Sequence, residues 1–313
     1  MPHYIRISIT LLLSLLSSAA SAQGFTVPWI CADRADSTSQ VWFRRTYTEL
    51  GDVARAVVQL TTTGFAQLYV NGRNVSADPM TPYRTGCGHE PLTLRYDVTA
   101  YVRPDTTVLA VWYSPTSPHA DSCQVAVGLE LTSADGICTA MHSGADWLWR
   151  TSSYRLNGSR GECADGRVEV LPWSYGAVEW PLWRGAQAVD APRRGLSALA
   201  AMPLRRCRVA EVVRPLSLVS HADTLTAIFP RELTALPRLT LRGAARGTRV
   251  YMPGFSYVCS GDIDEQAYPK FCVSRFSQLC ITGDAAFRPD MVQDVEAVVV
   301  TPYDDSPEWL YDD

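Results

Sequence analysis

Short stretches of alternating apolar and polar residues recur along the chain after residue 40. In residues 65–70, Phe-Ala-Gln-Leu-Tyr-Val, the side chains fall into two alternating sets, the period-2 pattern of a strand with two different faces. Asn71 and Gly72 follow directly, and this dipeptide favours a type I′ turn because both positions tolerate a positive φ. The pattern therefore predicts a tight β-hairpin whose return strand begins at Arg73.

Similar strand patterns continue on both sides of this hairpin, while long amphipathic helical patterns are missing. Between residues 173 and 204 the alternation gives way to Trp, Pro, Gly and Arg, which indicates a domain boundary near residue 200. We expect an all-β chain of two β-sandwich domains, residues 23–200 and 201–313. The expected strands are 40–47, 54–63, 65–70, 92–98, 107–113, 123–131, 136–142, 147–149, 168–171, 209–213, 224–229, 238–241, 248–252, 271–274, 278–282 and 295–300.

The first 22 residues have the pattern of a secretory signal peptide. His3 and Arg6 precede an apolar run from residue 7 to residue 16, and Ala20-Ser21-Ala22 offers a small-residue cleavage site. The apolar run is too short to span a membrane, and no later run reaches 18 apolar residues. We therefore expect an exported protein, periplasmic or extracellular, without a membrane span.

Charge and cysteine content narrow the function classes. The chain has 28 basic and 32 acidic side chains, a net charge of −4, and no long basic run, which argues against a nucleic-acid partner. Its nine cysteines include no C-x-x-C pair, so a zinc ribbon or thioredoxin-type motif is not expected. Export permits disulfides, and the odd count leaves at least one thiol free; buried unpaired thiols remain an equal alternative.

Several segments resemble one known family. Residues 65–72 (FAQLYVNG) and 96–99 (YDVT) are similar to the jelly-roll, galactose-binding-like sandwiches that precede many glycoside hydrolase barrels. Residues 40–45, residues 161–167 (GECADGR), and the pair Trp180 and Trp183 narrow the resemblance to the amino-terminal domains of bacterial α-L-rhamnosidases, glycoside hydrolase family 78. Residues 247–250 and 261–271 are similar to the family's second sandwich domain. Ala164 and Gly166 depart from its Gly-Glu-x-Tyr-Asp-Ala-Arg motif, which has Tyr and Ala there.

The resemblance implies that the catalytic residues lie in a domain other than these sandwiches. In that family a barrel of paired helices carries the acid and base carboxylates, and it would begin about where this chain stops. The resemblance therefore implies a secreted, non-catalytic accessory protein that binds a rhamnose-containing or another glycan. Two alternatives stay open. One is an α-L-rhamnosidase-type glycoside hydrolase that acts as a fragment or as half of a split enzyme completed by a helical-barrel partner, and the other is a structural envelope protein that has kept only the fold.

Candidate chemistry within the chain is limited, and no metal or cofactor is expected. Glycoside hydrolysis needs two carboxylates facing each other across a sugar, and Glu162 with Asp165 could supply them. The alternative, which we favour, is that both carboxylates hold a turn together with Arg167. Acidic residues at 262, 264 and 265 are spaced as in a calcium loop but lack the full ligand series, so a solvated loop is expected.

Aromatic residues are the remaining candidates, because sugars present flat C–H faces that pack on Trp and Tyr rings. Trp112 and Tyr113 end one expected strand, and a second group lies near the 161–167 motif. The alternative for the strand residues is a role in the sandwich core. The predicted carbohydrate-binding set is Trp112, Tyr113, Trp173, Tyr175, Trp180, Glu162, Asp165 and Arg167.

Overall fold

A computed structural model describes residues 27–76, 78–80, 92–116, 123–158, 161–168, 172–178, 180–192 and 206–303. The expected signal peptide, the expected domain boundary near residue 200 and, apart from Val168, the predicted strand 168–171 lie outside these residues. Strands are the dominant regular structure of the described part, and its helical residues form three short 3₁₀ turns, η2 (Thr99–Tyr101), η3 (Trp180–Leu182) and η4 (Pro289–Met291). The expected all-β sandwich class is confirmed. No described helix is long and apolar enough to cross a membrane.

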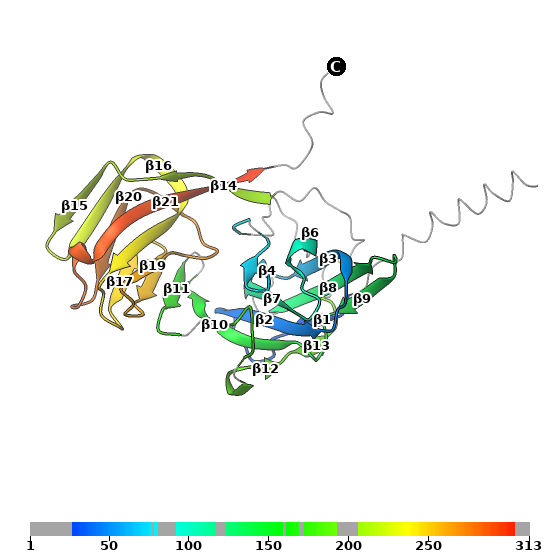
Figure 1. The fold of residues 1–313 in the computed structure, drawn as a ribbon. Coiled ribbons are helices and arrows are strands. Elements are labelled where there is room, and N and C mark those ends of the chain that lie inside the picture. The colour runs from blue at the N-terminus through cyan, green and yellow to red at the C-terminus, as the bar shows by residue number, and fades with distance from the viewer. Residues whose placement is uncertain are drawn as a thin grey trace, which may run out of the picture.

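The first unit consists of two facing sheets around one apolar core (Figure 1). One sheet has the order β13–β1–β8–β3–β6, with β9 beside β8, and the other runs β11–β10–β2–β7–β4–β5, with β12 beside β10. Inward residues of both, such as Phe43, Leu68 and Leu129, are fully buried. The strands are β1 (Trp29–Cys31), β2 (Ser39–Thr48), β3 (Val53–Thr62), β4 (Phe65–Val70), β5 (Arg73–Asn74), β6 (Leu92–Asp97), β7 (Thr106–Ser114), β8 (Gln124–Ser133), β9 (Cys138–His142), β10 (Leu148–Leu156), β11 (Glu162–Asp165), β12 (Arg184–Gly185) and β13 (Gln187–Val189).

The predicted hairpin is confirmed. Val70 pairs with Arg73, and the two turn residues have φ values of 49° at Asn71 and 84° at Gly72, both in the region that a type I′ turn requires. The Asn71 side chain adds two hydrogen bonds, from its Nδ2 to Tyr101 O at 2.8 Å and from Val108 N to its Oδ1 at 2.9 Å. The turn therefore also ties β4 to the η2 region and to β7.

The second unit has its own apolar core, centred on residues such as Leu239, Leu279 and Val295. Its centre is β16, a single strand of 19 residues where the sequence predicted two, 224–229 and 238–241. Pro230 lies within a register shift between Ile228 and Leu233, so the missing N–H of this proline interrupts the pairing with β20 without ending the strand. The strands are β14 (Arg206–Val213), β15 (Ser217–His221), β16 (Thr224–Arg242), β17 (Arg249–Met252), β18 (Phe255–Val258), β19 (Asp264–Ala267), β20 (Ser274–Gly283) and β21 (Val292–Tyr303).

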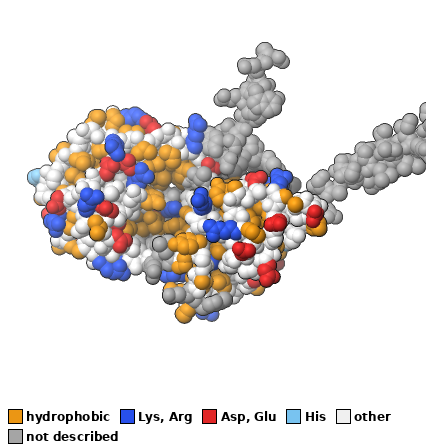
Figure 2. Space-filling view, in the orientation of Figure 1, with side chains coloured by type: hydrophobic (Ala, Val, Ile, Leu, Met, Phe, Trp, Pro, Cys, Tyr) orange, Lys and Arg blue, Asp and Glu red, His pale blue; other side chains and the backbone are white. Residues whose placement is uncertain are grey.

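Strand β11 joins the two units. It pairs antiparallel with β10 of the first unit and parallel with β18 of the second, so the two units share a hydrogen-bonded path. Figure 1 shows β11 between the two lobes. In the same orientation, Figure 2 shows hydrophobic side chains gathered on the second unit where it faces the first.

The predicted strand 271–274 is wrong. The described cysteines are all free thiols. The predicted strand 271–274 fails because β20 starts only at Ser274; Phe271 belongs to a loop and is buried against the first unit. Its apolar character therefore reflects burial, not strand pairing. None of the eight described cysteines is disulfide-bonded, and Cys87 lies outside the described residues.

Candidate functional site

The structure separates the predicted carbohydrate-binding residues into buried and exposed groups. Trp112 and Trp173 are each 6% exposed and Tyr113 is fully buried, so these three rings present no free face for a sugar to stack on. Tyr175 is 43% exposed and packs against the hairpin at Gly72. The side chain of Trp180 lies outside the described part. A role for this set in carbohydrate binding stays a prediction.

Trp112 and Trp173 belong to an aromatic cluster at the junction of the two units. Trp42 stacks on Trp173, with ring centroids 5.0 Å apart and an interplanar angle of 13°, and meets Trp112 edge to face at 5.5 Å. From the second unit, Phe271 lies parallel to Phe65 at 6.0 Å. Aromatic pairs with these geometries stabilise a contact beyond the area that they bury. We call Phe65, Trp42, Trp112, Trp173 and Phe271 the seam cluster.

Arg44 holds the segment that carries Trp173. Its guanidinium is buried and donates hydrogen bonds to the backbone oxygens of Trp173, at 3.3 Å, and Gly176, at 2.7 Å. Burial lowers the pKa of Arg44 to about 10. The planar guanidinium group carries several N–H donors in a fixed geometry. Arginine at position 44 can therefore satisfy several carbonyl groups of an irregular turn at once.

Glu162 is the chemically most unusual residue of the seam. Its side chain is fully buried; Oε1 accepts hydrogen bonds from Gln40 Nε2 at 2.8 Å and Phe271 N at 3.0 Å, and Oε2 accepts one from Lys270 N. Burial raises the pKa of Glu162 to about 7, although these hydrogen bonds act in the opposite direction. Gln40 continues the network by accepting a hydrogen bond from Trp112 Nε1 at 2.8 Å.

Lys270 places a cation beside this carboxylate. Its Nζ donates to Tyr69 Oη at 3.3 Å and lies 4.6 Å from the centroid of the Trp112 ring, a cation–π contact. Burial lowers the pKa of Lys270 to about 8, while the charge of Glu162 acts to raise it. The Lys270 ammonium thus has Tyr69 and Trp112 as partners, while the Glu162 carboxylate is satisfied by Gln40 and by backbone N–H groups.

Asp165 and Arg167 hold a turn together, as the alternative to a catalytic role predicted. Asp165 accepts from Arg167 N at 3.0 Å and pairs with its guanidinium through contacts of 2.9 and 2.7 Å. The charge and hydrogen bonds of Arg167 hold the pKa of Asp165 below its usual value. The same alternative is wrong for Glu162, whose backbone partners belong to the second unit. The structure thus places Glu162 and Asp165 in different environments on one strand.

An open groove lies where the β10–β11 turn meets the β17–β18 hairpin. It has a volume of about 420 Å³ and contains side chains from both units: Tyr251, which is 40% exposed, Asn157 and Ser256. Backbone at Gly161 and Gly254 completes its wall. The sequence analysis did not predict these residues as a site. Tyr251 is one of the exposed residues of β17, in which exposed and buried positions alternate, so this alternation could have identified it.

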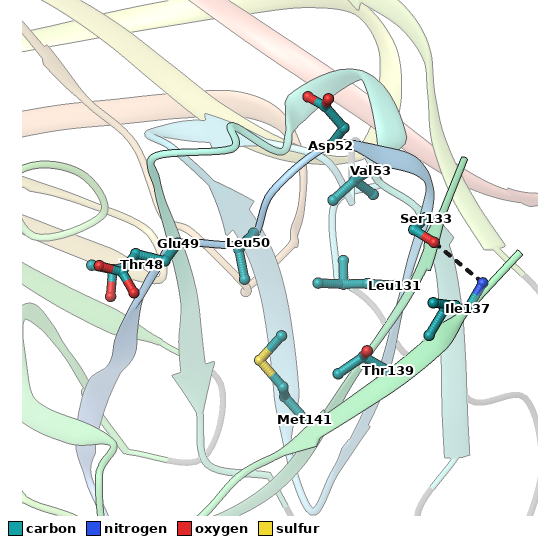
Figure 3. Close-up of a pocket in the computed structure, with 10 residues that line it drawn as sticks. All are labelled: Thr48, Glu49, Leu50, Asp52, Val53, Leu131, Ser133, Ile137, Thr139 and Met141. Carbon is teal, nitrogen blue, oxygen red and sulfur yellow. Dashed lines mark hydrogen bonds between the residues drawn. The ribbon is translucent and has the colours of Figure 1, made fainter. Parts of the chain in front are cut away.

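A second hollow, of about 310 Å³, lies on the first unit (Figure 3). Leu131 and Met141 form part of its apolar lining, and the carboxylates of Glu49 and Asp52 lie at its edge. One side is fixed by a hydrogen bond from Ile137 N to Ser133 Oγ at 3.2 Å. Among the described residues of the whole chain, no cluster of three or more His, Cys, Asp or Glu side chains could hold a metal.

Residues 51–208 match the family model of the α-L-rhamnosidase N-terminal domain, which covers half of the chain. The chain belongs to this family. Two curated relatives are α-L-rhamnosidases: one from Streptomyces avermitilis, 28% identical over 44% of this chain and 15% of its own length, and one from Formosa agariphila, 23% identical over 63% and 23%. This rhamnosidase N-terminal-domain protein therefore spans less than a quarter of the length of either of these two curated relatives.

Solved structures support the same fold for both units. An α-L-rhamnosidase from Dictyoglumus thermophilum superposes with a TM-score of 0.79 and 17% identity over 90% of this chain and 36% of its own. The Streptomyces avermitilis α-L-rhamnosidase complexed with L-rhamnose has a TM-score of 0.75 and 20% identity over 85% and 29%. At these identities the likeness concerns the fold.

The structure explains one departure from the rhamnosidase motif. Gly166 stands where the motif has Ala, and a Cβ at this position would overlap the hydroxyl group of Tyr257. Tyr257 Oη donates a hydrogen bond to Glu265 at 2.8 Å, so this hydroxyl group is held in place. The Tyr257 hydroxyl group therefore leaves no space for a side chain at position 166.

Proposed function

We propose that this protein is an exported, non-catalytic carbohydrate-binding module of the α-L-rhamnosidase type, with a rhamnose-containing glycan as its ligand. The observation that carries the proposal is the family match over residues 51–208, combined with a fold likeness to an α-L-rhamnosidase that covers 90% of this chain and 36% of that one. The buried seam supports a non-catalytic role, because Glu162 and Lys270 already have partners within the protein.

The groove beside Tyr251 is the proposed glycan site. A pyranose ring needs an aromatic face for its C–H groups and fixed polar groups for its hydroxyls. The exposed Tyr251 ring supplies the first, and the Asn157 amide and the Ser256 hydroxyl supply the second. The volume of about 420 Å³ is sufficient for one or two sugar residues at the scale of ordinary ligand pockets.

Affinity electrophoresis in gels that contain rhamnogalacturonan tests this site. We expect the wild-type protein to be retarded and Tyr251→Ala to bind about tenfold more weakly, which corresponds to about 1.4 kcal/mol of lost ring contact. The matched control is Tyr101→Ala, which removes a similarly exposed tyrosine from the first unit, far from the groove in sequence, and should leave retardation unchanged. Absence of retardation with any polysaccharide would refute binding and favour a structural envelope protein.

A second candidate is a split glycosidase completed by a helical-barrel partner. Strands β14 and β15 favour it, because Val209, Val212, Leu216, Leu218 and Val219 are all exposed large hydrophobic residues along one short stretch of chain. Release of rhamnose from an aryl rhamnoside is the test. We expect no release by the protein alone; release only after a helical-barrel protein from a neighbouring reading frame is added would establish the split enzyme instead.

A further inference from the structure

A five-residue loop of the second unit lies against the first unit and contributes Phe271 to the seam cluster. These residues, 268–272 (Tyr-Pro-Lys-Phe-Cys), link β19 to β20, and we call them the latch loop. Phe271 is buried against Phe65, and Lys270 lies over Trp112. Tyr268 O accepts a hydrogen bond from Tyr154 Oη at 3.1 Å. Apolar, cationic and backbone groups of one short loop thus all find partners on the other unit.

Glu162 ties this loop to both units at once. Its carboxylate accepts the N–H groups of Lys270 and Phe271, two consecutive residues of the latch loop, and also the amide of Gln40 on β2. Both carboxylate oxygens are occupied by donors. A buried N–H group without a partner costs about 1–3 kcal/mol, so the Glu162 acceptor stabilises the loop in this position.

We propose that Glu162 and the latch loop form an interdomain latch that fixes the orientation of the two β-units and joins their unfolding into one cooperative transition. Each unit has a separate apolar core, and separate cores ordinarily permit relative domain motion. The third buried cluster, which contains Phe271 together with Trp42 and Trp112, provides the shared surface. The latch does not depend on what the protein binds.

The pairing of β11 with β18 is the alternative source of rigidity. It consists of backbone contacts and is independent of the Glu162 side chain, so a substitution at 162 separates the two explanations. Glu162→Gln is suitable because it conserves shape; since each carboxylate oxygen faces an N–H donor, either orientation of the new amide places its NH₂ group against a donor.

Glu265→Gln is the matched control. Glu265 is also buried, and its two oxygens accept hydrogen bonds from Tyr257 Oη at 2.8 Å, Ser260 N at 2.7 Å and Gly261 N at 3.3 Å. It therefore resembles Glu162 in burial and in the number of donors. All of its partners lie within the second unit.

Hydrogen exchange of the full chain gives the direct readout. In Glu162→Gln we expect the amides of Lys270 and Phe271 to exchange at least about tenfold faster, and to accelerate by a larger factor than the core amides of β8 and β16. Glu265→Gln should leave the latch-loop amides unchanged. Unchanged latch-loop exchange in Glu162→Gln, or equal acceleration in both variants, would overturn the latch.

Calorimetry tests the coupling of the two units. The wild-type protein should unfold in one transition, with equal calorimetric and van't Hoff enthalpies, as should Glu265→Gln. Glu162→Gln should raise the ratio of the calorimetric enthalpy to the van't Hoff enthalpy above one, because the units then unfold separately. Phe271→Leu, which removes the ring stacked on Phe65 but fills the space, should do the same. Two separate transitions in the wild-type protein would contradict the proposal.

Discussion

The buried carboxylate of Glu162 makes the stability of this protein depend on pH in a direction opposite to that of a salt-bridged acid. Burial raises its pKa from the ordinary value of 4.5 to about 7, so the folded state holds this proton more tightly than the unfolded state. The stabilisation is fully present below pH 4.5 and is lost as the pH rises through 7. Glu162→Gln removes this titration and conserves the shape of the side chain.

The magnitude follows from the two pKa values. Each pKa unit corresponds to about 1.4 kcal/mol, and from pH 5 to pH 7 the linkage amounts to about 2 kcal/mol. The full side-chain burial of Glu162 means that no reduction for solvent screening applies. The free energy of unfolding of the wild-type protein, relative to that of Glu162→Gln, should therefore fall by about 2 kcal/mol over this interval.

The groups that face Glu162 keep their protonation state in this interval. Lys270 has a pKa of about 8 and stays protonated through most of it, and burial raises the pKa of Cys272 to about 12. Burial also raises the pKa values of Tyr154 and Cys163, so these groups stay neutral. Because the charge of Glu162 also acts to raise the pKa of Lys270, the wild-type minus variant difference reports the Glu162 carboxylate together with its coupling to Lys270.

Urea unfolding followed by tryptophan fluorescence measures this difference at pH 5, 6 and 7. The linear extrapolation at each pH gives the two free energies, and equal m-values for both proteins establish that the same transition is compared. A difference that stays constant within 0.5 kcal/mol (about a quarter of the expected change), or that moves in favour of the wild-type protein with rising pH, would refute the reasoning.

Three further substitutions test other contacts. Gly166→Ala should destabilise the fold by about 1–3 kcal/mol in urea unfolding because its Cβ overlaps the Tyr257 hydroxyl group, and the double variant with Tyr257→Phe should recover part of this loss; no recovery would contradict the contact. Arg44→Met should cost about 3 kcal/mol, since it leaves the carbonyl groups around Trp173 without donors, and a loss below 1 kcal/mol would exclude that role. Gly72→Ala should lower stability by about 1 kcal/mol, because φ there is 84° and the Tyr175 ring is 3.0 Å from the new Cβ; an unchanged melting midpoint would argue against strain in this turn.

Local signals predicted the local structure well. The alternation of Phe65 to Val70 and the Asn71-Gly72 dipeptide led to the observed hairpin, because a tight turn and the strand before it are decided by neighbouring residues. The same reasoning missed β11, whose four residues resemble a turn motif. This strand exists because β10 and β18, from opposite sides, supply its hydrogen-bond partners.

The candidate site was harder to predict for a related reason. Trp112 and Trp173 have the residue type that suits sugar stacking, but residue type does not report exposure, and here both rings pack in the interior. Glu162 belonged to a recognisable motif, yet its partners Lys270 and Phe271 lie more than 100 residues further along the chain. The strand pattern indicated that Tyr251 is exposed, but only the fold brings it into the same groove as Asn157.

By itself, the sequence determined the all-β class, the hairpin at Asn71-Gly72 and the resemblance to rhamnosidase amino-terminal domains, because strand periodicity, turn chemistry and family motifs are properties of short segments. Only the tertiary structure decided that Glu162 is a buried interdomain acceptor and that Phe271 belongs to a loop in the seam. The physical reason is that burial, pKa and hydrogen-bond satisfaction depend on groups brought together from distant parts of the chain.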